Sequence, residues 1–575
     1  MKNEIIIEDI YWDRIWLCFR ISGGHAPFFL VNSESGYYAS LKSMSNDSPA
    51  DFPDEIAGLL STCSSSLYKI NITNPGNCNM ISDGDFILTD NIESFSHKAK
   101  LTDLDESSYS DIASLSPSAA THINDFSRIF SFGNKGNFLV NIRILENDNA
   151  FPFFITFQTV NENNYSFMSS LKKLIVKTVY SIDKLIWHHK NGNNILIFSD
   201  QNENGSSNLS AFSEKLSSSG YQFDTEYRSL LTNHSSIKDW FRTIKKLARA
   251  NFIFLDDHSP TLNWLTLKDT VIIQLWHAGV GFKSTGYSRF GMPASPGTKS
   301  GHRQYTYGIT GSDSIRHYFS EVWGINESMV LPAGLPRMDT FLNSVHQSEC
   351  IKILTDKYPI LKNVSLSQNE QYKSNLVLYA PTYRGKNKKF AYFPFEKIDF
   401  DELYFICNKL NIIFAFKMHP FVSMCVPIPS KFSDRIIDLS EYPDINDIFL
   451  ITDILISDYS SDIYEFSALK RPMLFFDFDF EEYSLTRGFH RNYKKSIPGA
   501  ECKSFDTLLN KLEQIKNDSD FRNELIEKAS NESEKNFTLL DQKSCERIID
   551  WIINKHLPDE IQASIENEKK SVGKI

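Results

Sequence analysis

The sequence lacks a long apolar run and a secretion signal. Its longest hydrophobic stretches, such as IFLITDILI over 448–456, contain polar residues and fall short of the ~20 apolar residues of a membrane-spanning helix. The N-terminal segment MKNEIIIEDIYWDR carries acids inside its short apolar run, which is not typical of a signal peptide. We therefore expect a cytoplasmic protein that does not span a membrane.

The cysteines lack any regular spacing. None of the eight lies in a C-x-x-C or Cys/His zinc pattern, so we expect reduced, buried thiols rather than disulfides. No cluster of carboxylates indicates a required metal site, and Asp453 and Asp458 are expected to be structural. The sequence thus predicts neither a metal nor a cofactor.

The chain also lacks an excess of positive charge. It has 60 Lys and Arg against 71 Asp and Glu, a net charge of −11, which argues against a general nucleic-acid binder. A hydrophobic fraction of 41% with 23% charged residues is ordinary for a globular protein and excludes disordered or coiled-coil classes. At about 150 residues per domain, 575 residues predict three to four domains.

Residues 1–165 are expected to form a β-rich accessory domain, such as a β-sandwich. Short β-type segments separated by Ser, Asn, Asp and Gly turns indicate this fold, and a serine-rich stretch over 105–120 is expected to be a loop. The segments are IIIEDIYW, RIWLCFRI, PFFLVN, FILTD, NFLVNIRIL and FFITFQTV.

Residues 166–192 have the period of an amphipathic helix. Its apolar stripe consists of Phe167, Leu171, Leu174, Ile175, Ile182, Leu185 and Ile186, and lysines 172, 173, 177 and 184 occupy the rest. We favour a linker helix packed on the next domain. The alternative is a basic helix resting on an anionic membrane surface.

From residue 193 the pattern alternates between strand and helix. One series of buried strands is expected at 194–200, 250–257, 270–277 and 305–313, and a second at 375–382, 412–420, 453–461 and 472–479. This predicts an α/β fold of two doubly wound parallel-sheet domains, over 193–365 and 366–556, followed by a polar tail over 557–575. Ligands of such sheets bind beyond the carboxyl ends of the strands.

Polar residues follow the strands of the first series. His277 stands where a strand ends, before a glycine-containing loop, and a histidine can accept a hydroxyl proton near neutral pH. No Asp or Glu occurs from 270 to 312, whereas Lys283 and Arg289 do, which suits a phosphate-bearing substrate. Arg337 follows a tight turn and can hold phosphate oxygens.

Similar candidates follow the second series. Thr382 and Arg384 come after one strand, and Lys417 and His419 lie on the same face at the end of the next. In the segment ISDYSSDIYE, a strand leads into serines that start a helix, where free N–H groups favour an anion. Glu465 lies one helical turn after Ser461, within reach of ribose hydroxyls.

The motifs IQLWHAG…FK, LPAGLPRMD, LYAPTYR, FKMHP and SDYSSDIYEF…RPMLFFDFD, in this order over about 193–550, resemble the CDP-glycerol glycerophosphotransferase family of teichoic-acid and capsule synthesis. The resemblance implies a two-domain GT-B-like fold that follows the β-rich domain. It also implies transfer of glycerol phosphate or ribitol phosphate from a CDP-alditol to an acceptor hydroxyl, with release of CMP. A glycine-containing variant of the histidine motif is associated with the branch that includes polyribitol-phosphate enzymes.

The resemblance also implies the site residues. The residues matched to CDP-alditol binding are Trp276, His277, Ala278, Gly279, Val280, Arg337, Pro381, Thr382, Lys417, Met418, His419, Ser460, Ser461 and Glu465, the last in place of the family's usual aspartate. Lys283, Arg289 and Arg384 are further candidates for acceptor or phosphate contacts. The implied acceptor is a poly(alditol phosphate) or a lipid-linked primer, so we expect peripheral attachment to the cytoplasmic face of the membrane, with no nucleic-acid partner.

We expect His277 to act as the general base and His419, Lys417, Arg337 and the serines to stabilise phosphate charge. The two histidines could exchange these roles. One alternative is a GT-B glycosyltransferase that uses a nucleotide sugar in cell-surface polysaccharide synthesis. The other is a catalytically silent partner in a polymer-assembly complex.

Overall fold

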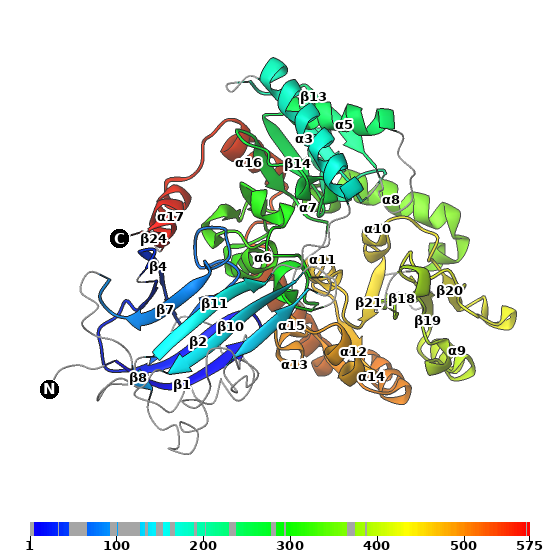
Figure 1. The fold of residues 1–575 in the computed structure, drawn as a ribbon. Coiled ribbons are helices and arrows are strands. Elements are labelled where there is room, and N and C mark those ends of the chain that lie inside the picture. The colour runs from blue at the N-terminus through cyan, green and yellow to red at the C-terminus, as the bar shows by residue number, and fades with distance from the viewer. Residues whose placement is uncertain are drawn as a thin grey trace.

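The computed structural model comprises a β-sandwich followed by two α/β halves (Figure 1). It describes residues 5–32, 34–44, 66–92, 100–101, 127–132, 136–144, 153–160, 167–188, 192–201, 203–228, 237–277, 283–292, 295–364, 374–385, 388–570 and 572–574. Within these ranges no helix combines the length and the apolar character needed to cross a membrane.

The β-sandwich consists of two sheets whose inner faces share one apolar core. Every segment predicted to be β-type in this region is a strand, whereas the serine-rich stretch over 105–120 lies outside the described residues. In sheet order, the five-stranded sheet is β5 (Lys42–Ser43), β6 (Ser66–Asn71), β2 (Trp16–Ser22), β1 (Ile6–Asp13) and β8 (Lys100–Leu101). The seven-stranded sheet is β24 (Val572–Lys574), β4 (Tyr37–Ser40), β3 (Phe29–Val31), β7 (Gly84–Thr89), β11 (Phe153–Val160), β10 (Asn137–Ile144) and β9 (Arg128–Ser131).

The first α/β half contains a six-stranded, fully parallel sheet. Its order is β13 (Phe223–Tyr227), β12 (Ile195–Ser199), β14 (Phe252–Leu255), β15 (Val271–Gln274), β16 (Tyr307–Ile309) and β17 (Val330–Leu331). Successive strand residues point into different cores, Leu196 into one and Ile197 into the other. The helices of this half are α3 (Phe167–Trp187), α4 (Ser207–Ser218), α5 (Ile237–Arg249) and α6 (Arg316–Trp323).

The second half repeats this plan with the strand order β20 (Ile436–Asp438), β19 (Ile412–Phe416), β18 (Asn375–Tyr379), β21 (Thr452–Ser457), β22 (Met473–Phe476) and β23 (Ala500–Cys502). All of its pairs are parallel, and Leu378 and Tyr379 face different cores. Its helices are α9 (Phe400–Leu410), α10 (Ile445–Phe449), α11 (Ile463–Ser467), α12 (Phe480–Thr486), α13 (Tyr493–Ser496), α14 (Phe505–Asn517) and α15 (Ser519–Asn536).

Two segments connect the halves. α7 (Pro336–Phe341) and α8 (Ser344–Lys357) lead from the first sheet, and their apolar residues Met338, Phe341 and Leu354 belong to a core of the second half. In the opposite direction, α16 (Ser544–Ile548) and the π-helix at Ile549–Ile553 pack on the first sheet. The predicted boundaries at 365 and 556 therefore do not separate the packing units, because helices from each side of these boundaries pack on the other half.

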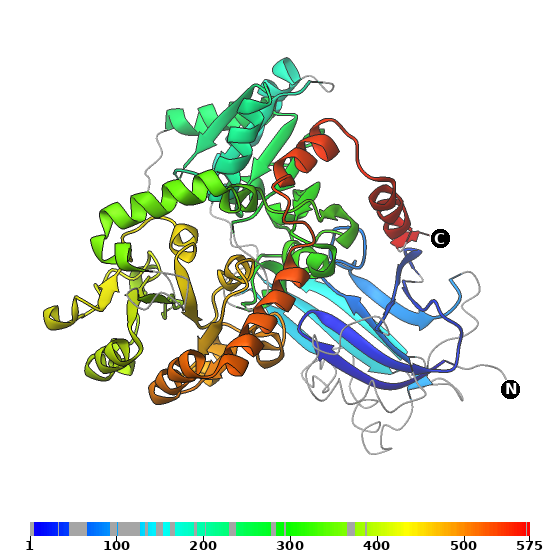
Figure 2. The same ribbon diagram turned by 180° about the vertical axis from the view of Figure 1, so that it is seen from behind.

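The segment over 557–575, predicted to be a polar tail, has regular structure where the structure describes it. It contains α17 (Asp559–Lys569) and β24, which pairs antiparallel with β4 of the sandwich. Figure 2 shows the last segment, in red, running from the first half to the sandwich. The short strand escaped prediction because Val572–Lys574 has too few residues to show a β period.

The helix α3 packs on α5, but through a different face from the one predicted. Val176, Val179 and Tyr180 contact the core of the first half, whereas Leu174 and Leu185 are 61% and 86% exposed. The predicted packing of this helix on the next domain is therefore confirmed, but the side chains that make the contact are not those of the predicted apolar stripe. The helix has two apolar faces, and among the residues that the structure describes, the core of the first half covers one of them.

A buried ionic network connects all three parts of the molecule. Glu321 on α6 accepts hydrogen bonds from Arg14 of the β1–β2 turn and pairs with His490 of the second half, at 2.9 Å from its Nε2. These two partners hold the pKa of the Glu321 carboxyl well below its usual range, against the opposite effect of burial. The network fixes the sandwich against both α/β halves.

Candidate functional site

The candidate residues lie at the carboxyl ends of the two parallel sheets. His277 follows β15, Thr382 follows β18, Lys417 follows β19 and Ser460 follows β21. In each sheet the strand order reverses beside the first strand, between β12 and β14 and between β18 and β21. Such reversal points open a crevice where open α/β sheets bind their ligands.

His277 is held in one tautomer by the backbone. Its Nδ1 lies 3.0 Å from the carbonyl oxygen of Asp256 and 3.5 Å from Oδ2 of Asp257. Because a carbonyl oxygen only accepts hydrogen bonds, Nδ1 carries the proton and the lone pair of the neutral ring resides on Nε2. The side chain is 43% exposed, which leaves that lone pair available to a ligand.

The turn after β15 is fixed by Asn208 of α4. The Asn208 amide donates to the carbonyl oxygens of Leu275 and Trp276, at 3.2 and 2.8 Å, and its oxygen accepts from the backbone N–H of Arg337 at 3.0 Å. Trp276 has a φ of 58°, and its ring stacks on that of His277 at 4.8 Å. Ala278, Gly279 and Val280 lie outside the described residues.

Arg337 forms a buried ion pair with Glu465 of α11, across the two halves. Its other terminal nitrogen donates to the backbone carbonyl of His277 at 2.7 Å. Burial lowers the pKa of Arg337 to about 10, so the guanidinium remains charged at neutral pH. Glu465 is 2% exposed, so its described contact is to Arg337 rather than to solvent.

Lys417 and His419 lie side by side in the second half. Lys417 is buried, donates from Nζ to the Ser440 carbonyl at 3.0 Å, and has its pKa lowered by burial. Burial, Lys283 and Lys417 lower the pKa of His419 to about 4. The Phe421 N–H donates to Nδ1 of His419 at 3.1 Å, so the neutral ring carries its proton on Nε2. The neutral His419 ring can thus donate a hydrogen bond from Nε2, whereas the neutral His277 ring can accept one at Nε2.

The His419 environment predicts a specific dependence of stability on pH. The folded-state pKa of about 4 lies below the ordinary 6.5. Above pH 6.5 the ring is neutral in both states, and as the pH falls the unfolded chain binds a proton that the folded chain resists. The wild type should therefore lose on the order of 2–3 kcal/mol more than His419→Asn between pH 7 and pH 4. Chemical denaturation at both pH values measures this, and parallel losses would contradict it.

Thr382 and Arg384 belong to a buried polar network. The Thr382 N–H and hydroxyl donate to the two Asp458 oxygens, at 2.9 and 3.0 Å. The Arg384 guanidinium donates to Asp458 at 2.9 Å and to Asp479 at 2.5 and 2.8 Å. The guanidinium N–H groups of Arg384, which we expected to contact phosphate, therefore donate to these carboxylates instead. Pro381, beside this network, and Met418, before His419, are buried.

The two serines lie in the turn between β21 and α11. The Ser460 hydroxyl donates to Asp462 at 3.0 Å, and the Ser461 carbonyl accepts from the Tyr464 N–H. Both serines are half-buried, and α11 begins at Ile463. The helix therefore begins two residues after Ser461, later than predicted, and Asp462 is the residue that flanks its start.

The loop after His277 contains two basic residues, Lys283 and Arg289, and contacts the second half. The backbone of Lys283 forms an isolated antiparallel β-bridge with that of Phe489, and the Ser284 N–H donates to the Gly488 carbonyl at 3.2 Å. Burial and the charge of Arg487 lower the pKa values of both Lys283 and Arg289. Arg289 is buried, and its Nε has no hydrogen-bond partner among the described residues. This arrangement leaves positive charge that an anionic ligand can neutralise.

Sequence analysis missed several residues of this site. Asp256 and Asp257 directly follow β14, and the rule that ligands meet strand ends could have found them. Asp462 acts on Arg337, Lys417, His419 and Lys283, favouring the protonated form of each. Asn208 and Arg487 come from helical or turn segments with no motif, and their roles depend on tertiary contacts.

Comparison with known proteins gives a consistent result. The profile of the family CDP-Glycerol:Poly(glycerophosphate) glycerophosphotransferase matches residues 181–554. Teichoic acid ribitol-phosphate polymerase TarL of Staphylococcus aureus is 34% identical over 384 residues, which are 66% of this chain and 65% of TarL. The teichoic acid poly(ribitol-phosphate) polymerase of Bacillus spizizenii is 31% identical over 439 residues, 76% of this chain and 67% of the relative. This chain thus spans about two thirds of the length of these relatives.

Among solved structures, that of the wall teichoic acid polymerase TagF superposes with a TM-score of 0.52 at 21% identity, over 69% of this chain and 98% of TagF. At this identity the likeness concerns the fold. The likeness agrees with the match of the family profile.

Proposed function

Because the chain belongs to the CDP-glycerol:poly(glycerophosphate) glycerophosphotransferase family, we propose that it transfers an alditol phosphate from a CDP-alditol to an acceptor hydroxyl and releases CMP. The observation that carries this proposal is the pair of complementary histidines. His277 presents a lone pair on Nε2, and His419 presents an N–H on Nε2. A phosphoryl transfer needs one group that takes a proton and others that stabilise phosphate charge.

We propose a GT-B-like arrangement in which donor and acceptor meet between the two α/β halves. The ion pair of Arg337 and Glu465 and the contact of Ser284 with Gly488 both bridge the halves near the strand ends. In this arrangement the second half holds the CDP group, and the first half contributes His277 and the cationic loop. Lys417 and His419 supply charge and a donor for the phosphates, and Ser460 and Ser461 supply hydroxyls.

The reaction proceeds by in-line displacement at the β-phosphorus of the donor. The acceptor hydroxyl oxygen bonds to phosphorus while Nε2 of His277 takes its proton, and the bond from phosphorus to the CMP oxygen breaks with its electron pair leaving on CMP. His419, neutral with its proton on Nε2, donates a hydrogen bond to a phosphate oxygen, and Arg337 and Lys417 stabilise the negative charge. Asp256 and Asp257 orient His277 throughout.

Arg384 acts indirectly in this proposal. Its guanidinium is bound to Asp458 and Asp479, so it positions the Thr382 turn rather than binding phosphate. Lys283 and Arg289 remain candidates for acceptor phosphates, together with Arg487, because the charge of Arg487 repels that of both residues and lowers the pKa of each. A poly(alditol phosphate) supplies the anions that would offset this repulsion.

We propose ribitol phosphate as the transferred group. The support is the activity for which the two relatives described above are named, since both are ribitol-phosphate polymerases. The test is acceptor-dependent release of CMP from CDP-ribitol and CDP-glycerol side by side, with a short phosphopolyol acceptor and a reaction without acceptor. Release from CDP-ribitol only supports the proposal, release from CDP-glycerol only reassigns the alditol, and release from neither, with CMP still bound, contradicts the activity.

We also propose that α3 attaches the protein peripherally to the cytoplasmic membrane face, where a lipid-linked acceptor lies. Its uncovered face carries Leu171, Leu174, Ile175, Ile182, Leu185 and Ile186, each at least 40% exposed. Lys172 and Lys177 on the same helix are exposed as well. Exposed apolar side chains flanked by lysines are typical of helices that lie in an anionic interface.

The double variant Leu174→Glu/Leu185→Glu should bind anionic vesicles about 10-fold or more weakly, because two apolar side chains no longer enter the interface. Sedimentation with vesicles of phosphatidylglycerol measures this. The matched control is Phe405→Glu/Leu485→Glu, which replaces two equally exposed apolar residues on α9 and α12. Equal binding by the two double variants would exclude α3 as the attachment site.

A further inference from the structure

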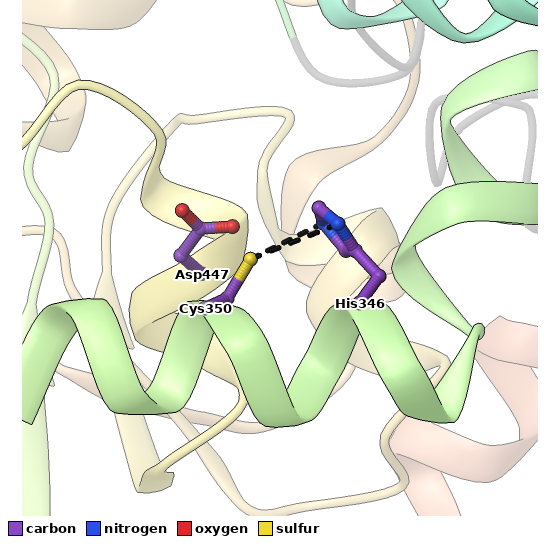
Figure 3. A group of neighbouring side chains, drawn as sticks. All are labelled: His346, Cys350 and Asp447. Carbon is purple, nitrogen blue, oxygen red and sulfur yellow. Dashed lines mark hydrogen bonds between the residues drawn. The ribbon is translucent and has the colours of Figure 1, made fainter.

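His346, Cys350 and Asp447 form a side-chain cluster away from the candidate phosphotransfer site. His346 and Cys350 lie one turn apart on α8, and Asp447 faces them from α10 (Figure 3). The Cys350 Sγ lies 3.3 Å from Nε2 of His346, and one ligand atom from each of the three residues lies within 4.8 Å of the others. Cys350 is buried, and the other two are half-buried.

These distances suit tetrahedral coordination. Bond lengths of about 2.3 Å to sulfur and about 2.0 Å to nitrogen at tetrahedral angles place the two ligand atoms roughly 3.6 Å apart. The observed separation of 3.3 Å needs only a small adjustment of the half-buried His346 ring. A thiolate, an imidazole and a carboxylate are a ligand set that favours Zn²⁺ over Mg²⁺ or Ca²⁺, which prefer oxygen alone.

We propose that His346, Cys350 and Asp447 bind a Zn²⁺ ion, with water as the fourth ligand. This function is separate from the proposed phosphotransfer and does not depend on it. The cluster escapes sequence inspection because the third ligand is almost a hundred residues from the first two. The spacing His-x-x-x-Cys becomes informative only once α8 is known to be a helix that faces α10.

The charges around the cluster favour a cation. The negative charges of three carboxylates interact electrostatically with the Cys350 sulfur. They belong to Asp447, Asp444 and Glu349. A dication would offset this accumulated charge, which the apolar surroundings of Cys350 do not screen. The Tyr442 hydroxyl also donates to Oδ2 of Asp447 at 2.9 Å, and such an outer hydrogen bond orients a ligating carboxylate.

The location indicates a structural role for the ion. α8 belongs to the segment that connects the two α/β halves, and α10 packs against both α8 and α11, which carries Glu465. Asp444, which caps α10, also acts on Arg337. A metal bond between α8 and α10 would therefore fix the connecting segment to the second half.

The test measures Zn²⁺ binding to the full chain after removal of metal by a chelator. We expect about one equivalent to bind, the melting temperature to rise, and Co²⁺ in its place to give the near-ultraviolet absorption of a cobalt–thiolate bond. Cys350→Ala and His346→Ala should each weaken Zn²⁺ binding by on the order of 100-fold, and Tyr442→Phe by about 10-fold. His346 is half-exposed, so its variant should fold even if Cys350→Ala does not.

Cys425→Ala is the matched control, since Cys425 is an exposed free thiol elsewhere in the second half. Its Zn²⁺ affinity should equal that of the wild type. Absence of stoichiometric binding would overturn the proposal, and so would binding that is unchanged in His346→Ala or that is lost in Cys425→Ala. A bound ion without a thiolate band in the cobalt form would also overturn it, because Cys350 would then not be a ligand.

Discussion

Replacement of His277 by alanine is expected to lower acceptor-dependent turnover by on the order of 10³-fold and to leave donor affinity within a few-fold of the wild type. The reason is the fixed tautomer of the ring. The backbone carbonyl of Asp256 accepts a hydrogen bond from Nδ1–H, so Nε2 is available to take the proton of the acceptor hydroxyl. Single-turnover release of CMP measures the first quantity, and titration calorimetry with the CDP-alditol measures the second.

His556→Ala provides the control for this result, because His556 is an exposed histidine that pairs with Asp550 far along the chain. It should turn over like the wild type. His419→Ala should also be slow, but as the loss of a phosphate hydrogen bond it should weaken donor binding as well. If His277→Ala turned over as fast as the wild type, His277 would be excluded as the base, and another group would have to take the proton.

The second large effect concerns the ion pair of Arg337 with Glu465. Arg337→Met should lower the free energy of unfolding by about 3–5 kcal/mol, since it leaves the carboxylate of Glu465 buried without its partner. It should also lower turnover by about 10²-fold or more through loss of a cation at the phosphates. Denaturant unfolding and CMP release measure the two effects.

A double variant separates stability from catalysis. Arg337→Met combined with Glu465→Gln removes both charges, so most of the lost stability should return. Turnover should stay low, because the guanidinium is still missing. If the double variant regained turnover together with stability, Arg337 would be a structural residue only.

The sequence allowed prediction of the buried parallel strands but not of the sheet edges. β12, β14, β18, β19, β21 and β22 all appear as predicted, because strands covered on both faces are continuously apolar. β13, with the sequence FDTEY, and β20, with IID, lie at edges and carry charged residues, so periodicity does not reveal them. The packing of α16 on the first half could not be predicted either, because its apolar residues are compatible with the core of either half.

For the site, the sequence predicted the positions of the candidate residues better than it predicted their contacts. His277, Lys417 and His419 follow strands, as the motifs indicated, whereas Arg337 lies in the first turn of α7. The roles that the structure distinguishes depend on partners from distant segments, such as Asp256 for His277 and Asp479 for Arg384. The exposed apolar face of α3 has a similar origin, since the helix carries two apolar stripes and the sequence does not show which one the protein covers.

The mass of the product tests the central proposal most directly. A short phosphopolyol acceptor is incubated with CDP-ribitol and the protein, and the products are separated and weighed by mass spectrometry. The proposal predicts acceptor species that are heavier by whole ribitol phosphate units, formed in step with CMP and absent with His277→Ala. An acceptor that stays unchanged, or one that gains hexose units when nucleotide sugars are supplied instead, would contradict it.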